Sequence, residues 1–493
     1  MKKLLAGIIG ASLCFSMFAC GKKSESTTKT TKDGTTERTT FYNDKETNLL
    51  PRIDIVSEDG KNDFATVPTR TNKWDYVNCT VSVKDGEELK IDSAVAGVKV
   101  RGNWTTEYPK KPLRIKFDKK QSMLGLNGNQ KFKSWLLLAE FKDWSMLRNA
   151  TAFDIAKILG NEYSSDYKFV NVYINNEYWG VYLLCEQQEA KEGRVSITEP
   201  AKNYEGTDIG YLLEFDGYYT DELPLETFTI DYQTMTTYSG VNFSNFQKGF
   251  TIKSDIYSQA QNTFIKNYMQ NVYDICYQAI YNNTYKEFDS NYENLVTSTL
   301  TNSKDVVAKV VDIDSIVNSY ILSEIACDTD LAWSSFFMDV DFGATGDKKL
   351  RFEAPWDFDS SFGNTVACID AEGLYAANTF KDVHGDTVAN PWFLLFIHAD
   401  WFRQLVKEKW SSLISANAFN PVLQNIKTIS TTYEGDFIEN YNRWDNLGNK
   451  SYFWIEFDKS DAGKCKNYID TANCLYNWLS KRITNLTTLF NNF

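Results

Sequence analysis

Two aspartates, Asp357 and Asp359, stand two residues apart in an aromatic segment at residues 355–363. Side chains at i and i+2 share one face of an extended strand, so these carboxylates would repel each other unless a proton or cation lies between them. Mg²⁺ is usually held by one or two carboxylates together with substrate phosphates. The aromatic neighbours would exclude water and strengthen the field at such an ion. The alternative is an exposed turn in which both aspartates are solvated.

A second group of residues is basic. A glycine turn at residues 101–104 follows an alternating segment, and glycine lets a backbone approach a ligand closely. Lys110, Lys111, Arg114 and Lys116 then fall within seven positions, and on a strand the last two share one face. In a chain of net charge −13, this local cluster indicates phosphate contact. The alternative is the solvated basic face of an edge strand.

Further polar residues stand at the ends of predicted helices. Arg148 lies near the start of one, where it either orients towards a cleft or belongs to an ordinary surface helix. Glu324, Asp328 and Asp330 lie at the C-terminal end of another, where carboxylates are electrostatically unfavourable. That position indicates either a bound cation or a polar loop in solvent.

Several classes of function are disfavoured by composition. The chain has 493 residues, enough for two lobes or domains, and a pI near 4.9 argues against a binder of nucleic-acid backbones. Its only histidines, His384 and His398, are too few for a His-rich zinc site and have no convincing Ser or Cys partner for a hydrolase.

The N-terminus carries a processing signal. Lys2 and Lys3 precede a short apolar run, and Cys20 follows it, as at a bacterial lipoprotein cleavage site. We therefore expect a signal peptide at 1–19, a lipid on Cys20 and a disordered Thr- and Lys-rich tether at 20–45. The protein would be anchored at the cell membrane on its extracytoplasmic side. Ordinary secretion is the alternative, and no later segment is long and apolar enough to predict a membrane span.

The number and spacing of the cysteines do not predict a disulfide framework. Of the nine cysteines, seven lie beyond Cys20, without CxxC pairs. That pattern is typical of neither a zinc site nor a disulfide scaffold, so we expect mostly buried free thiols and one or two disulfides at most.

Hydrophobic periodicity predicts an α+β protein with two lobes. The first, 46–220, is β-rich, with strands at 77–83, 95–100, 113–117, 135–138, 169–174 and 178–184, and one main helix at 144–159 with Asp143 as its N-cap. The second, 221–493, is mainly helical, with helices at 255–281, 314–327, 401–416, 421–433 and 461–489. Within it, segments 336–340 and 350–352 are predicted to pair and to deliver the chain to the acidic segment.

Eight motifs in order carry a resemblance. They are VRGNW (100–104), PKKPLRIK (109–116), WLLLA (135–139), DWSMLRN (143–149), NEYWGVYLLCE (176–186), GYLLEFD (210–216), Asp330 with Ser334 and Ser335, and PWDFD (355–359) running on to Phe362 and Gly363. Taken together, over about residues 75–365, the chain resembles the CotH kinase family of spore-coat-protein-H-like atypical kinases. The family usually has Asn where Glu140 stands, Asn before the catalytic acid where Asp328 stands, and Lys-Pro where Lys253 and Ser254 stand.

The resemblance implies an atypical protein-kinase-like bilobal fold that binds ATP with Mg²⁺ or Mn²⁺ and phosphorylates protein. By this resemblance Asp330 looks like the catalytic-loop acid, and Asp357, also catalytic, looks like a metal-binding acid beside Asp359 and Asp328. Either Lys111 or Lys116 looks like the phosphate-binding lysine. Arg148, Glu186 and Trp356 complete the expected nucleotide site.

Three functions follow as alternatives. The first is a lipid-anchored kinase that transfers the γ-phosphate of ATP to a protein hydroxyl, with ATP and a protein as partners and no nucleic acid. The second is a catalytically silent relative acting in adhesion or in coat or envelope assembly. The third, a glycosidase with Asp357 and Asp359 as its acid pair, is disfavoured because neighbouring residues on one strand cannot easily flank a sugar bond from both sides.

Overall fold

The computed structural model describes residues 40–66, 75–246, 249–328, 330–364, 369–381, 385–448 and 460–493. Residues 41–493 form one compact unit, and everything below concerns that unit. Cys20, most of the predicted tether and His384 lie outside the described residues. Among the described helices, none combines the length and apolarity needed to cross a membrane.

Seven strands close into a barrel in the order β1-β2-β3-β4-β5-β7-β6. Neighbours are antiparallel except β1 and β6, which run parallel and complete the closure. The strands are β1 (Arg52–Ser57), β2 (Val77–Asp85), β3 (Glu88–Val100), β4 (Leu113–Gln121), β5 (Phe132–Leu138), β6 (Tyr167–Ile174) and β7 (Glu177–Glu186). The predicted strands all fall within these.

Along the barrel strands, successive side chains point alternately into the barrel and out of it. Leu113, Ile115 and Phe117 of β4 are buried in its interior, while Arg114 and Lys116 point outwards. A tight hairpin joins β6 and β7. Its two turn residues, Asn175 and Asn176, have φ of 49° and 65°, the left-handed values that a tight two-residue turn requires.

A second sheet has the order β15-β8-β12-β9, with β8 (Gly210–Asp216), β9 (Thr227–Phe228), β12 (Gly249–Ile252) and β15 (Phe336–Asp341). The predicted pairing of 336–340 with 350–352 is wrong in its main partner, because β15 pairs along its whole length with β8. Only Arg351 bridges back, to Asp339. The proposed boundary near residue 220 falls between β8 and β9 of this one sheet.

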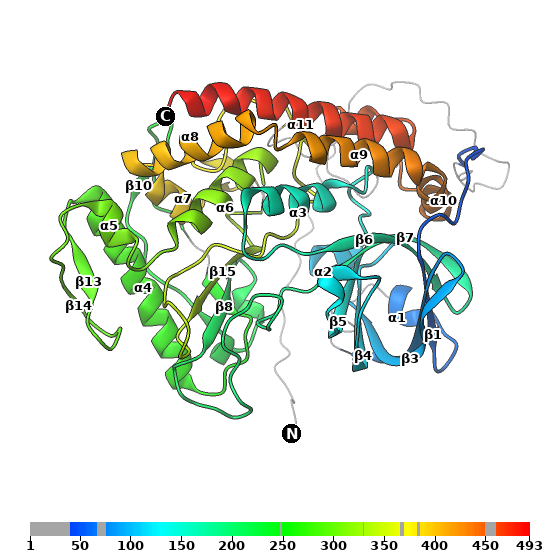
Figure 1. The fold of residues 1–493 in the computed structure, drawn as a ribbon, viewed down its shortest axis with the longest axis horizontal. Helices are drawn as coiled ribbons and strands as arrows, with labels where there is room; N and C mark the ends of the chain where they lie inside the picture. The colour runs from blue at the N-terminus through cyan, green and yellow to red at the C-terminus, as the bar shows by residue number, and fades with distance from the viewer. Residues whose placement is uncertain are drawn as a thin grey trace, which may run out of the picture. The chain divides into compact units, whose positions relative to one another are not determined.

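The longer helices are α3 (Arg148–Leu159), α4 (Gln259–Tyr281), α6 (Ile313–Ala326), α8 (Asp400–Ser415), α9 (Asn420–Thr432), α10 (Glu434–Trp444) and α11 (Tyr468–Asn491). The five helices predicted for the second half are confirmed, with shifted ends. Figure 1 shows α8, α9 and α11 side by side, and α11 packs on both of the others. Sequence periodicity missed α10, which packs against β7 of the barrel.

Short elements fill the connections. They are α1 (Asp63–Thr66), α2 (Leu126–Asn129), α5 (Ser303–Val307), α7 (Pro391–Phe396) and the strand pairs β10 (Met235–Thr236) with β11 (Asn242–Phe243), β13 (Lys286–Phe288) with β14 (Leu295–Thr297), and β16 (Phe380–Lys381) with β17 (Thr387–Val388).

A buried ion pair joins α6 to α11. Arg482 Nη2 lies 3.0 Å from Glu324 Oε2, and both side chains are fully buried. The same carboxylate accepts hydrogen bonds from the backbone N–H groups of Tyr375 and Ala376. Burial raises the pKa of Glu324, and the charge of Arg482 opposes that rise. The cation expected beside Glu324 is therefore an arginine of the protein itself.

Removing Arg482 would leave the Glu324 carboxylate buried without its partner. We expect Arg482→Met to lower the free energy of unfolding by about 3 to 5 kcal/mol. The matched control is Lys481→Met, because Lys481 pairs with Glu372 at 3.0 Å where both side chains are more than half exposed. Such a pair contributes about 1 kcal/mol or less. Denaturant unfolding measures both losses, and equal losses would contradict this assignment.

Candidate functional site

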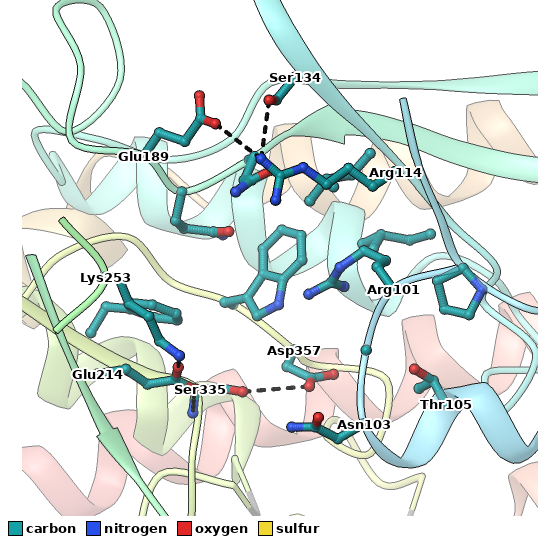
Figure 2. Close-up of a pocket in the computed structure, with 18 of the residues that line it drawn as sticks. Arg101, Asn103, Thr105, Arg114, Ser134, Glu189, Glu214, Lys253, Ser335 and Asp357 are labelled. Carbon is teal, nitrogen blue, oxygen red and sulfur yellow. Dashed lines mark hydrogen bonds and ion pairs between the residues drawn. The ribbon is translucent and has the colours of Figure 1, made fainter. Parts of the chain in front are cut away.

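A cavity of about 1050 Å³ lies against the outer face of β3, β4 and β5. Its other walls come from β8, from the chain after β12, and from the segments at 330–337 and 356–360. Residues far apart in the sequence therefore face one space. Figure 2 shows Arg101 and Arg114 on one side of this space, with Lys253, Glu214, Ser335 and Asp357 on the other.

The barrel supplies the basic wall. Lys99, Arg101, Arg114 and Lys116 all line the cavity. Arg114 Nη2 donates to Ser134 Oγ at 3.1 Å and lies 3.5 Å from Glu189. The Arg101 guanidinium lies 5.2 Å from the centre of the Trp356 ring, within cation–π range. Burial lowers the pKa of Arg101, and the charge of Asp357 opposes that effect.

Three carboxylates face this wall. Asp330, Asp357 and Asp359 line the cavity, and Ser335 Oγ donates to Asp357 Oδ2 at 3.4 Å. Burial raises the pKa of Asp330 to about 7, and the charges of Asp328 and Asp359 add to it. Burial raises the pKa of Asp357 well above its ordinary value, reinforced by Asp359 and Asp330. The three groups therefore behave as one repulsive electrostatic cluster.

The acidic segment is not the extended strand that the spacing predicted. Asp357 has a φ of 68°, and its neighbours Ala354 and Phe362 have φ of 58° and 51°. The burial pattern nevertheless alternates: Trp356, Phe358 and Ser360 are buried, while the two aspartates are half-buried. Ser335, opposite, has a φ of 62°. Strained backbone of this kind collects at functional sites, where surrounding structure must hold it.

Lys142 is a further cation beside these acids, and sequence reasoning missed it. Its ammonium donates to Ser360 Oγ. Burial lowers the pKa of Lys142, but the charges of Tyr108, Asp359, Asp330 and Asp357 together raise it above the ordinary value. The residue lies in the loop between β5 and α3, and a lone lysine there carries no sequence signal.

Arg148 holds the acidic segment from behind and does not line the cavity. It forms a buried ion pair with Asp143, at 2% and 0% exposure. Its Nε donates to the Ser361 carbonyl at 3.0 Å and its Nη2 to that of Phe362 at 3.4 Å. Asp143 Oδ2 also accepts from the Arg148 backbone N–H at 2.8 Å. The prediction of Asp143 as the N-cap is wrong, because α3 begins at Arg148 with Leu147 in the N-cap position.

Asn149, the next residue, fixes the middle of the same segment. Its Oδ1 accepts from the Phe358 N–H at 2.7 Å, and its Nδ2 donates to Glu140 Oε1 at 3.0 Å. Burial raises the pKa of Glu140 well above its usual range. Glu140 thus acts through Asn149 on the residue between the two aspartates.

The adjacent lysines Lys110 and Lys111 are tied to backbone. Lys111 Nζ donates to the carbonyls of Thr106 and Tyr108 at 2.6 and 2.8 Å, and its side chain does not line the cavity. Lys110 Nζ donates to the carbonyls of Ala139 and Val181. Gly102, before this loop, has a φ of 96°, and a Cβ there would lie 2.3 Å from Thr105 Oγ1. Lys111 therefore holds the turn that the glycine permits, while Lys110 is bonded to the chain after β5 and to β7.

The remaining candidates divide in the same way. Trp356 and Lys116 line the cavity. Glu186 lies away from it, bonded to Asn127 at 2.6 Å and to Arg194 at 3.2 Å. Asp328 is buried, and its Oδ1 accepts from the Asp330 N–H at 3.0 Å. The catalytic and binding roles of all these residues stay predictions.

A lysine–glutamate pair lies on the same side of the cavity as Asp357. Lys253 Nζ lies 2.7 Å from Glu214 Oε2 and 3.8 Å from Asp216, on neighbouring strands of the second sheet. Glu214 Oε1 accepts from the Ser335 N–H at 2.8 Å. Lys253 thus sits, through Glu214, beside the serine that donates to Asp357.

A metal ion here would need ligands from outside the protein. In the described parts of the chain, no group of three or more His, Cys, Asp or Glu side chains is placed to hold an ion. Mg²⁺ rarely uses such a set, since one or two carboxylates with substrate phosphates suffice. The two half-buried aspartates fit that pattern.

Comparison with known proteins gives one positive result. No curated protein matches the chain. The family described as CotH kinase protein matches residues 98–486. The match runs from β3 to α11 and so includes the C-terminal helices, which contributed nothing to the resemblance seen in the motifs. This chain, a mixed α+β protein built on a closed seven-stranded barrel and a helical remainder, belongs to the CotH kinase protein family.

Proposed function

We propose that the protein is an atypical kinase with a kinase-like bilobal arrangement, which transfers the γ-phosphoryl group of ATP to a protein hydroxyl. One observation carries the proposal: cationic side chains from the barrel and three carboxylates from the helical part face the same cavity. Phosphoryl transfer requires these parts, because catalysis is mainly positioning and charge stabilisation.

Asp357 and Asp359 would hold Mg²⁺ or Mn²⁺, with Asp328 behind them through the backbone of Asp330. When bound, the ion would neutralise charge on the phosphate oxygens. Without an ion or a proton the two aspartates repel each other and Asp330, as the raised pKa of Asp357 indicates. A metal–triphosphate complex would relieve that repulsion.

Several cations are available for the phosphates. Arg101, Lys116 and Lys142 line the cavity, whereas the ammonium of Lys111 donates to two backbone carbonyls. These contacts favour Lys116 over Lys111 among the two predicted lysines and add Lys142. Trp356 beneath Arg101 would keep that side of the cavity dry.

Asp330 would accept the proton of the attacking hydroxyl. A general base works best when its pKa is near the operating pH, and burial places that of Asp330 at about 7. The lipid on Cys20, the extracytoplasmic location and the protein substrate belong to the same proposal. The silent alternative, a surface protein for adhesion or coat assembly, is favoured by Trp104, whose side chain lines the cavity at 49% exposure.

Asp357→Ala should abolish nucleotide binding. We expect ATP with Mg²⁺ or Mn²⁺ to raise the melting temperature of the full chain and to leave that of this variant unchanged. Asp118→Ala is the matched control, because Asp118 is exposed on β4 and does not line the cavity. Thermal-shift titration measures all three proteins. Absence of any nucleotide-dependent shift in the wild type would favour the silent alternative.

Lys142→Met should weaken ATP binding about 10- to 100-fold, the usual cost of losing a charged hydrogen bond to phosphate. Lys142→Arg should restore part of it. Lys111→Met is the control, and we expect its dissociation constant for ATP to stay within about threefold of the wild type, although its stability falls. Calorimetric titration with ATP and Mg²⁺ measures the dissociation constant of each variant. Loss of binding in Lys111→Met alone would return the phosphate role to Lys111.

The ionisation of Asp330 should also make the stability of the metal-free protein depend on pH. Its folded pKa of about 7 exceeds the ordinary 3.8, so the folded state binds an extra proton between these values and stability falls as pH rises through this window. The D330N variant cannot ionise there. Between pH 4 and pH 8, we expect the free energy of unfolding of this variant to fall by about 1 to 3 kcal/mol less than that of the wild type. Denaturant unfolding in chelator tests this, and parallel pH profiles would contradict it.

A further inference from the structure

Two cysteines far from the cavity lie against each other. Cys465 follows a short turn at Ala462–Lys464, and Cys474 lies in the second turn of α11. Their Sγ atoms are 3.0 Å apart. This is closer than an ordinary contact between two sulfur atoms. Only residues 466–473 separate the two cysteines in the sequence.

The surroundings of the pair suit thiol–disulfide exchange. Cys474 is half-buried, so an oxidant can reach its sulfur, while Cys465 is 7% exposed. The hydrogen bond from Cys465 lowers the pKa of Cys474, and the positive charge of Arg148 adds to this effect. An accessible thiol of lowered pKa beside a second cysteine is the usual arrangement at redox-active sites.

We propose that Cys465 and Cys474 form a disulfide by exchange with a disulfide-bearing oxidant. The Cys474 thiolate attacks one sulfur of the oxidant, a mixed disulfide forms, and one thiol of the oxidant leaves. Cys465 then loses its proton, attacks the Cys474 sulfur and displaces the second thiol. The two cysteines lose two electrons and two protons, and the oxidant's disulfide becomes two thiols.

The bond would brace the acidic segment from behind. Thr471, between the two cysteines, donates through Oγ1 to the Trp144 carbonyl at 3.1 Å. Trp144 belongs to the loop that ends at Arg148, and Arg148 donates to the carbonyls of Ser361 and Phe362. The disulfide would therefore fix the start of α11 against the loop that holds the two metal-candidate aspartates in place. The bond itself does not depend on nucleotide binding.

Peptide mapping tests the bond directly. The full chain is incubated with oxidised glutathione, alkylated without reductant and cleaved at lysines and arginines. Cleavage releases Cys465 with Lys466 and leaves Cys474 in residues 467–481. We expect the 467–481 peptide to carry the Cys465–Lys466 dipeptide, and to lose it on reduction. Alkylation of both cysteines, or a link from either one to a different cysteine, would overturn the proposal.

The bracing role has its own measurement. Reduction should lower the melting temperature of the oxidised wild type by roughly 3 °C, because a short covalent loop restricts the unfolded chain. The C474S variant should show no redox dependence. The C276A variant is the control, since Cys276 is buried in α4, and it should keep the wild-type shift. A linked peptide with no difference in melting temperature would overturn the brace.

Discussion

Repulsion among Asp330, Asp357 and Asp359 is the interaction on which the rest of the site depends. These groups are held near one another in a partly dry cavity, where like charges interact more strongly than in water. A fold that did not constrain them would relax by turning one aspartate into solvent. The structure instead places Lys142 among them and surrounds their backbone with buried hydrogen bonds. Under the proposed function, a metal–phosphate complex would relieve this repulsion on binding.

The constraint is imposed from one short stretch of sequence, residues 140–149. Asn149 holds the N–H between the two aspartates, and Arg148 holds two carbonyls beyond them. Asp143 neutralises Arg148 and accepts from the first backbone N–H of α3, so the helix and the brace share one carboxylate. Because Asp357, Ser335 and Glu140, which all line the cavity, have positive φ, a weaker support would let the backbone relax to ordinary angles. The motif at 143–149 is therefore a positioning element.

Sequence periodicity was sufficient to predict the helices and strands, but it did not predict which strands pair or which side chains face the cavity. The alternation in β4 predicted which face carries Arg114 and Lys116, and the helices of the second half were found from their 3.6-residue repeat. The pairing of β15 with β8 spans more than 120 residues, and no local pattern encodes it. Lys111 and Lys116 look alike in the sequence, yet one ammonium is consumed by backbone carbonyls and the other faces the cavity. Only the path of the 102–109 turn separates them.

The departure at Glu140 follows from the same hydrogen-bond chemistry. The family pattern has an asparagine there, and an asparagine oxygen can accept from Asn149 Nδ2 as the Glu140 carboxylate does. The replacement thus preserves the hydrogen bond that positions Asn149 and adds a buried acid. Burial, and the nearby charges of Asp143 and Asp359, raise the pKa of that acid, and the charge of Lys110 opposes the rise. Lys110 is itself buried and bonded to the Ala139 carbonyl, one residue away. Lys110 of the 109–116 motif therefore serves the acidic segment at a distance. It offsets the glutamate that orients Asn149, and Asn149 orients the residue between the two aspartates.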